Sequence, residues 1–149
     1  MIEMRMNMFL FFIIPWLIAT IFFRGQKRLF RGLFPFSSLL STSVCLWGDY
    51  HRYWVFKPNL KKFQVMTTMP LTLGLYPVLS TLMVYLIKQT KESPSSWILT
   101  FTCLTTILEF LMKLFGRATY GNGWTLNKTF ISYLIPYYLV HKYSQFFLK

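Results

Sequence analysis

Acidic side chains are scarce in this sequence, with four Asp and Glu against sixteen Lys and Arg in 149 residues. Charged residues of both signs make up only 13% of the chain, whereas a water-soluble domain carries about a quarter. This shortage argues against a soluble globular protein, and the 54% of apolar residues argues against disorder. The net charge of +12 alone would suit nucleic acid, but the apolar content favours a membrane and no nucleic-acid partner.

The sequence also lacks the short motifs of several enzyme classes. It contains no C-x-x-C, H-E-x-x-H, G-x-S-x-G, P-loop or dinucleotide-binding pattern. We therefore predict no catalytic residue, no metal site and no cofactor. The two cysteines, Cys45 and Cys103, both fall in apolar stretches, where we expect buried free thiols that say little about the redox compartment.

What the chain has instead is a series of long stretches with few charges. A helix needs roughly 20 mostly apolar residues to cross the hydrocarbon of a bilayer, and five stretches approach that length. We predict an all-α fold, a polytopic membrane helical bundle of about five transmembrane helices in a single domain, residues 1–149. The third span contains Pro70, Gly74 and Pro77 and should be kinked, and the fifth is short and contains Pro136. The predicted spans are residues 6–23, 33–50, 63–87, 97–115 and 128–148.

The first apolar stretch could be a membrane anchor or a cleaved signal peptide. No small-x-small cleavage site follows it, whereas a cluster of four basic residues does, which is typical of a stop-transfer signal and favours the anchor. Five spans place eight Lys and Arg on each side of the membrane, so the positive-inside count is tied. The basic cluster after the first span favours an N-terminus outside. Tryptophans at the ends of spans should lie at headgroup level, namely Trp47, Trp54, Trp97 and Trp124.

Two of the acids lie at or near membrane depth, where ionisable groups are costly and are candidate functional residues. Asp49 ends the second span and Glu109 lies in the fourth, and since these spans run in the same direction both carboxylates belong to the same half of the bilayer. We expect them to face each other in a polar cluster that binds a cation, a proton or a lipid headgroup. Local charge pairing explains the same residues, through Glu109 with Lys113 at i, i+4 and Asp49 with Arg52. The candidate site residues are Asp49, His51, Arg52, Glu109, Lys113, Tyr120, Asn122 and Trp124.

The segment from Tyr120 to Trp124 is a strong turn signal. Asn122 next to Gly123 tolerates positive backbone dihedral angles, and a tight turn with Trp124 anchored at the interface accounts for the pattern. A loop that contacts a ligand is the alternative. His51 beside one acid falls far short of a metal site and is expected to be an interfacial side chain.

The order of the acidic residues and of the turn along the chain resembles that in a family of small multi-span integral membrane proteins of Gram-positive spore-forming bacteria. The resemblance extends from about Leu29 to Tyr143 and is most specific in the block from Glu109 to Trp124, with Asp49 closing the second span. It implies a helical, multi-pass protein of the cell membrane and no particular activity. Some relatives place a His one turn after the Glu, where this chain has Lys113, and this departure favours charge pairing over a metal.

Three functions are compatible with the sequence. The first is a non-enzymatic accessory component of the envelope whose polar cluster organises the bundle, with anionic lipid headgroups of the bilayer as partners and an unidentified membrane protein or a homo-oligomer as a further possibility. The second is a small proton- or ion-coupled transporter that uses Glu109 and Asp49. The third is a lipid-modifying enzyme in which Asp49 orients His51 as a general base.

Overall fold

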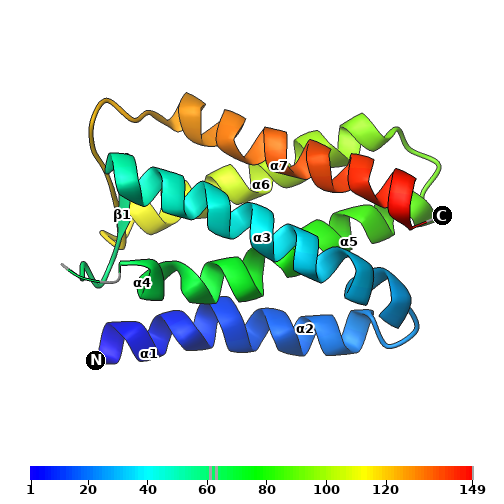
Figure 1. Cartoon of the computed structure of the whole chain (residues 1–149), viewed down its shortest axis with the longest axis horizontal. Helices are drawn as coiled ribbons and strands as arrows, with labels where there is room; N and C mark the ends of the chain where they lie inside the picture. The colour runs from blue at the N-terminus through cyan, green and yellow to red at the C-terminus, as the bar shows by residue number, and fades with distance from the viewer. Residues whose placement is uncertain (61, 63, 149) are drawn as a thin grey trace.

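The computed structural model describes residues 1–60, 62 and 64–148. Five long helical rods run side by side, and successive rods point in opposite directions (Figure 1). The first rod joins α1 (Ile2–Met8), η1 (Phe9–Ile13) and α2 (Ile14–Phe22), and the second is α3 (Lys27–His51). The third joins α4 (Val65–Pro70), η2 (Leu71–Leu75) and α5 (Tyr76–Gln89). The last two are α6 (Pro94–Leu114) and α7 (Leu126–Phe147).

The predicted all-α membrane bundle is confirmed. In the described part of the chain, four of the rods are long and apolar enough to cross a membrane, namely those that end at Phe22, His51, Gln89 and Leu114. The fifth, α7, has 22 residues, which at 1.5 Å per residue make about 33 Å of helix, but it is not among the helices that are apolar enough to cross. Its crossing stays a prediction.

The helix boundaries differ from the predicted spans by a few residues. α3 begins at Lys27 rather than residue 33, because its basic first two turns continue the helix beyond the apolar stretch. The predicted start of the third span, Phe63, lies outside the described residues, and the helix there begins at Val65.

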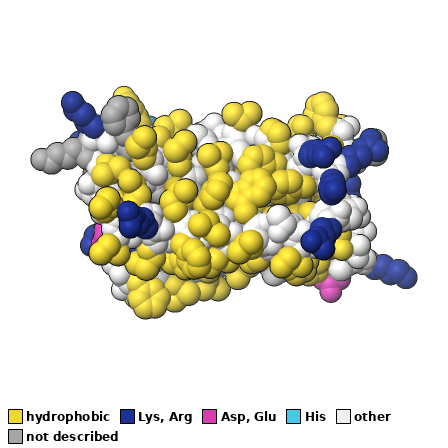
Figure 2. Space-filling view, turned by 90° about the horizontal axis from the view of Figure 1, so that it is seen from below, with side chains coloured by type: hydrophobic (Ala, Val, Ile, Leu, Met, Phe, Trp, Pro, Cys, Tyr) yellow, Lys and Arg dark blue, Asp and Glu magenta, His cyan; other side chains and the backbone are white. Residues whose placement is uncertain are grey.

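The face of the bundle in Figure 2 is largely apolar along its middle, and Lys and Arg side chains gather toward its two ends. Large side chains such as Leu17, Ile107 and Ile135 are about half exposed. A soluble monomer rarely exposes so much contiguous apolar surface, whereas lipid solvates it well. Cys103 also faces outward, so the prediction of a buried thiol is wrong there, while Cys45 is buried and both thiols are free.

Two π-helical segments, η1 and η2, pack against each other where the first and third rods meet. Each lies just before a proline, Pro15 and Pro77, whose ring nitrogen has no N–H for the carbonyl four residues earlier. The carbonyl that Pro77 leaves without this donor, that of Leu73, accepts a hydrogen bond from Trp16 Nε1 at 3.2 Å. The predicted kink in the third span is thus a change of helix type at Gly74 and its neighbours.

A short antiparallel strand pair closes one end of the bundle. β1 (Trp54–Phe56) follows α3, and β2 (Ala118–Tyr120) follows α6, with Trp54 opposite Tyr120. The sequence analysis did not predict these strands. Trp54 is buried, at 5% exposed, and its indole covers Gly48, so it is not the headgroup-level anchor that we expected.

Candidate functional site

Glu109 is the centre of the polar interior at the end of the bundle that carries the strand pair. It lies five residues before the end of α6 and is 7% exposed. Its Oε1 accepts hydrogen bonds from the hydroxyls of Tyr120 at 2.7 Å and Thr129 at 3.2 Å. Its Oε2 accepts one from the hydroxyl of Tyr133. The carboxylate therefore joins α6 to both β2 and α7.

A second layer of hydrogen bonds supports these three hydroxyls. Trp124 Nε1 donates to Thr129 Oγ1 at 2.8 Å, and the hydroxyls of Tyr76 and Tyr133 lie 2.9 Å apart. An ionised carboxylate only accepts hydrogen bonds, so Tyr133 gives its single proton to Glu109 and must accept the proton of Tyr76. The result is a directed chain from Tyr76 on α5 through Tyr133 to Glu109.

The face of α7 that meets α6 provides most of these groups. Thr129, Tyr133 and Tyr137 are spaced four residues apart and so share one side of the helix. Tyr137 hydroxyl lies 2.6 Å from Thr105 Oγ1 on α6, one turn before Glu109. This row of hydroxyls sets the register between the two helices around the carboxylate.

The strand pair and the following turn hold Tyr120 in place. Pairing with Trp54 fixes its backbone, and Gly121 N donates to Tyr53 O at 2.9 Å. Asn122 and Gly123 have φ of 48° and 71°, which confirms the predicted turn, and Asn122 Nδ2 donates to His51 O. Burial, and then the charge of Glu109, raise the pKa of the Tyr120 hydroxyl, which therefore stays protonated as a donor at neutral pH.

A cavity of about 40 Å³ lies beside Glu109, between α3, α5 and α7. Apolar side chains form much of its wall, and hydroxyl groups from three helices interrupt them. The oxygen-bearing side chains that line it, besides Glu109, are Ser37, Ser41, Tyr76, Ser80, Ser132, Tyr133 and Tyr137. Glu109 is thus both a hydrogen-bonding hub and part of the cavity wall.

The structure assembles part of the predicted polar cluster. Tyr120 contacts Glu109 directly, and Trp124 reaches it through Thr129. Lys113 lies differently from the i, i+4 prediction, because its Nζ sits over the ring of Tyr120, 4.4 Å from the centroid. Hydroxyl groups take the place at Glu109 that the sequence analysis assigned to this ammonium.

Asp49 does not join this site. It lines a separate groove beside Gln64 and Val65, and its carboxylate oxygens are enclosed and accept no hydrogen bond from the residues that the structure describes. The expected face-to-face arrangement with Glu109 is absent from this part of the chain, as is the expected pair with Arg52. Arg52 instead ends α3 in a left-handed conformation, with φ 53°.

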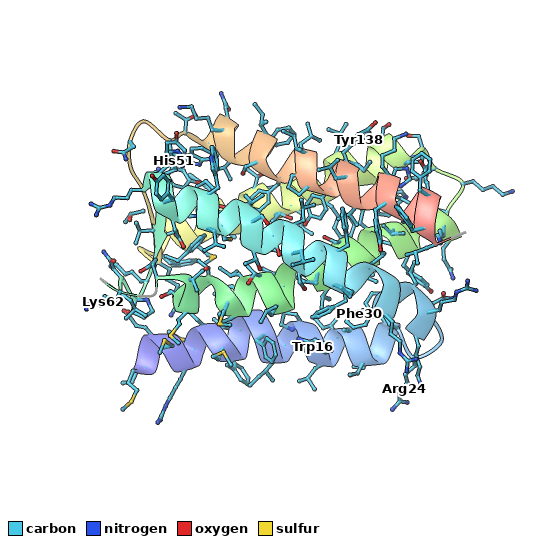
Figure 3. All side chains as sticks on the ribbon, viewed as in Figure 1. Trp16, Arg24, Phe30, His51, Lys62 and Tyr138 are labelled. Carbon is cyan, nitrogen blue, oxygen red and sulfur yellow. The ribbon has the colours of Figure 1, made fainter. Side chains whose placement is uncertain are left out.

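His51 is the last residue of α3, at the strand-pair end of the bundle (Figure 3). Its place at a membrane interface stays a prediction. Its Nδ1 donates to Trp47 O at 2.9 Å, and its ring stacks on Tyr53. Because Nδ1 donates to a backbone carbonyl, the predicted contact in which Asp49 orients His51 is not formed among the described residues.

Sequence analysis missed Thr129, Tyr133 and Tyr76. The first two were detectable in principle, because polar residues spaced four apart in a helix of low charge indicate a polar inner face. Tyr76 carried no such signal, since its role depends on how α5 packs against α7. In the described part of the chain, no group of three or more His, Cys, Asp and Glu lies together as metal ligands would. No family model, curated protein or solved structure matches the chain.

Proposed function

We propose that this chain is a non-enzymatic, multi-pass component of the cell membrane, in which the Glu109 centre holds the strand-pair end of the bundle together. The observation that carries the proposal is that both oxygens of one buried carboxylate accept hydroxyl hydrogen bonds from two other elements, β2 and α7. Polar groups between helices act as glue in membrane proteins. The centre would fix the positions of α6, β2 and α7 at the strand-pair end of an accessory envelope protein.

The first test replaces the acceptor and keeps the side-chain shape. Glu109→Gln turns one oxygen into an NH₂ donor that faces hydroxyl donors, and we expect a loss of about 1–3 kcal/mol in unfolding free energy. Asp49→Asn is the matched control, because its carboxylate accepts no hydrogen bond from the described residues. Thermal unfolding of both purified proteins in detergent measures the difference.

Equal stability of the Glu109→Gln protein and the wild type would contradict this proposal. So would a flux of protons or ions through liposomes that contain the wild-type protein, since an accessory component carries none. If Asp49→Asn lowers stability as much as Glu109→Gln does, the loss is not specific to the hydrogen bonds of Glu109, and the proposal fails.

A second candidate function is a small proton- or ion-coupled transporter, favoured by the chain from Tyr76 through Tyr133 to Glu109. If Glu109 takes up a proton, it donates to Tyr133, and Tyr133 then donates to Tyr76. The three groups can therefore exchange a proton between the cavity and the carboxylate by reversing their hydrogen bonds. Asp49 takes no part in this series of hydrogen bonds.

Proteoliposomes with a trapped pH-sensitive dye test the transporter. Uptake that follows an imposed gradient in the wild type and is lost in Tyr133→Phe would support it. The matched control is Tyr138→Phe on the outer face of the same helix, where the labelled side chain points away from the bundle (Figure 3). Absence of flux in the wild type would refute it.

We further propose that the chain belongs to the cell membrane of a Gram-positive spore-forming bacterium, on the basis of the sequence resemblance. Lys and Arg at both ends of the rods (Figure 2) suit contact with anionic headgroups at either surface. Cross-linking in membranes would test for a homo-oligomer or a membrane partner.

A further inference from the structure

When Glu109 is ionised, its charge has no opposite charge among its direct contacts. All three of its hydrogen-bond partners are neutral hydroxyls, and Lys113 lies over the ring of Tyr120 instead. An isolated charge inside a membrane protein is costly, and a counter-charge reduces that cost. One carboxylate needs one positive charge.

The cavity beside Glu109 has room for such a charge. A cavity of about 40 Å³ exceeds the roughly 10–15 Å³ that a single water requires. It can hold a small ion with a water or two. Besides Glu109, its side-chain oxygens come from Ser37 and Ser41 on α3, Tyr76 and Ser80 on α5, and Ser132, Tyr133 and Tyr137 on α7.

One buried oxygen in the cavity wall is free to bind a ligand. Ser37 is 2% exposed, and its Oγ has no hydrogen-bond partner in the described part of the chain. Buried hydroxyls without a partner are uncommon, and each calls for a ligand, a water or an ion. On α7, Ser132 and Pro136 both line the cavity, and Pro136 provides no N–H for the carbonyl of Ser132 four residues earlier.

We propose that this cavity binds one monovalent alkali cation, Na⁺ or K⁺, with Glu109 as its counter-charge and hydroxyl oxygens as ligands. Tyr76 gives its proton to Tyr133, which gives its own to Glu109, so a lone pair of the Tyr76 oxygen is available to the ion. A divalent ion would need more carboxylates than the single one in this wall. This cation site rests on the proposed function, because it uses the Glu109 centre. In an accessory component the ion would have a structural role. In a transporter the same ion would be the coupling ion.

The experiment compares salts at equal ionic strength. Thermal unfolding of the purified wild type is measured in NaCl, KCl and choline chloride, since a ligand that binds only the folded state raises the midpoint with its concentration. We expect a midpoint several degrees higher in one alkali chloride than in choline chloride. Asp49→Asn should keep this response, Ser37→Ala should need more salt for it, and Glu109→Gln should lose it.

A second readout does not depend on the stability of a variant. Trp54 lines the cavity, and the other tryptophans do not, so titrating the wild type with the alkali ion should change its emission saturably. A Trp54→Phe protein should lose this change, while Trp47→Phe, which alters an exposed indole, should keep it.

Identical midpoints in all three salts with unchanged emission would overturn the cation site. A midpoint that follows pH but not the identity of the cation would also overturn it, because the positive charge would then be a proton on Glu109. A Glu109→Gln protein that is less stable, beside a wild type with no salt-specific response, would leave the proposed function standing without this site. If the wild type responds to one salt specifically and Glu109→Gln is as stable as the wild type, the cation site would stand and the proposed function would fall.

Discussion

The two sides of the bundle are joined in different ways. α6 and α7 are held by directed hydrogen bonds around Glu109, whereas the N-terminal rod lies against η2 mainly through shape. There, the missing side chain of Gly74 lets the backbone of Phe11 approach so closely that a Cβ would overlap it. Lipid offers little hydrophobic force between helices, so close packing and polar contacts must join them. Hydrogen bonds dominate around Glu109 and close packing dominates at η2. At the strand-pair end the N-terminal rod adds two hydrogen bonds through buried Asn7, which donates to Lys57 O and accepts from Arg117.

The largest effect should come from filling the gap at Gly74. Gly74→Ala places a methyl group where the backbone of Phe11 lies, and backbone cannot rotate away as a side chain can. We expect a loss of about 1–3 kcal/mol in unfolding free energy, and faster proteolysis of the N-terminal rod. Thermal unfolding and limited proteolysis in detergent measure the two effects.

Gly25→Ala is the matched control, because a Cβ at that turn meets no atom within 4 Å. Its stability should stay within about 0.5 kcal/mol of the wild type. If both substitutions cost the same, close approach does not hold the N-terminal rod, and the contrast between the two sides is wrong.

The predictable part of this fold is the part that the bilayer dictates. Long stretches of low charge become helices because lipid leaves no other way to satisfy backbone groups, and this fixed the rods to within a few residues. Depth along the helix also placed Asp49 and Glu109 toward the same end of the bundle. Partner choice was not predictable in this way, since Lys113 and Thr129 are equally reasonable neighbours for Glu109 until the rotation of α7 is known.

The strand pair shows a second limit of the sequence. β1 and β2 have three residues each and lie more than 60 positions apart, and neither is long enough to produce a clear alternating pattern. Their pairing depends on the ends of α3 and α6 meeting at the same rim. Tyr120 therefore looked like part of a turn, although its backbone belongs to a strand and its hydroxyl to the Glu109 centre.

A smaller effect should come from the hydrogen-bonded side. Tyr133→Phe removes one donor from Glu109 and one acceptor from Tyr76, while the ring keeps its packing. We expect a loss of about 1–2 kcal/mol, because an unpaired buried polar group retains its desolvation cost. Tyr138→Phe, on the outer face of α7, should change stability little. A Tyr133→Phe protein as stable as Tyr138→Phe would show that this side, too, is held by shape alone.

The smallest effect should come from the one hydrogen bond described between the N-terminal rod and η2. Trp16→Phe keeps an aromatic ring beside Phe30 (Figure 3) and Phe34. It removes the donor to Leu73 O. Interhelical hydrogen bonds in membranes contribute about 0.6 kcal/mol on average, so the loss should be of that order and well below that of Gly74→Ala. The Leu73 carbonyl also lacks its usual helical donor because of Pro77, so a loss larger than that of Gly74→Ala would mean that this bond, and not the close backbone approach, joins the rod to the bundle.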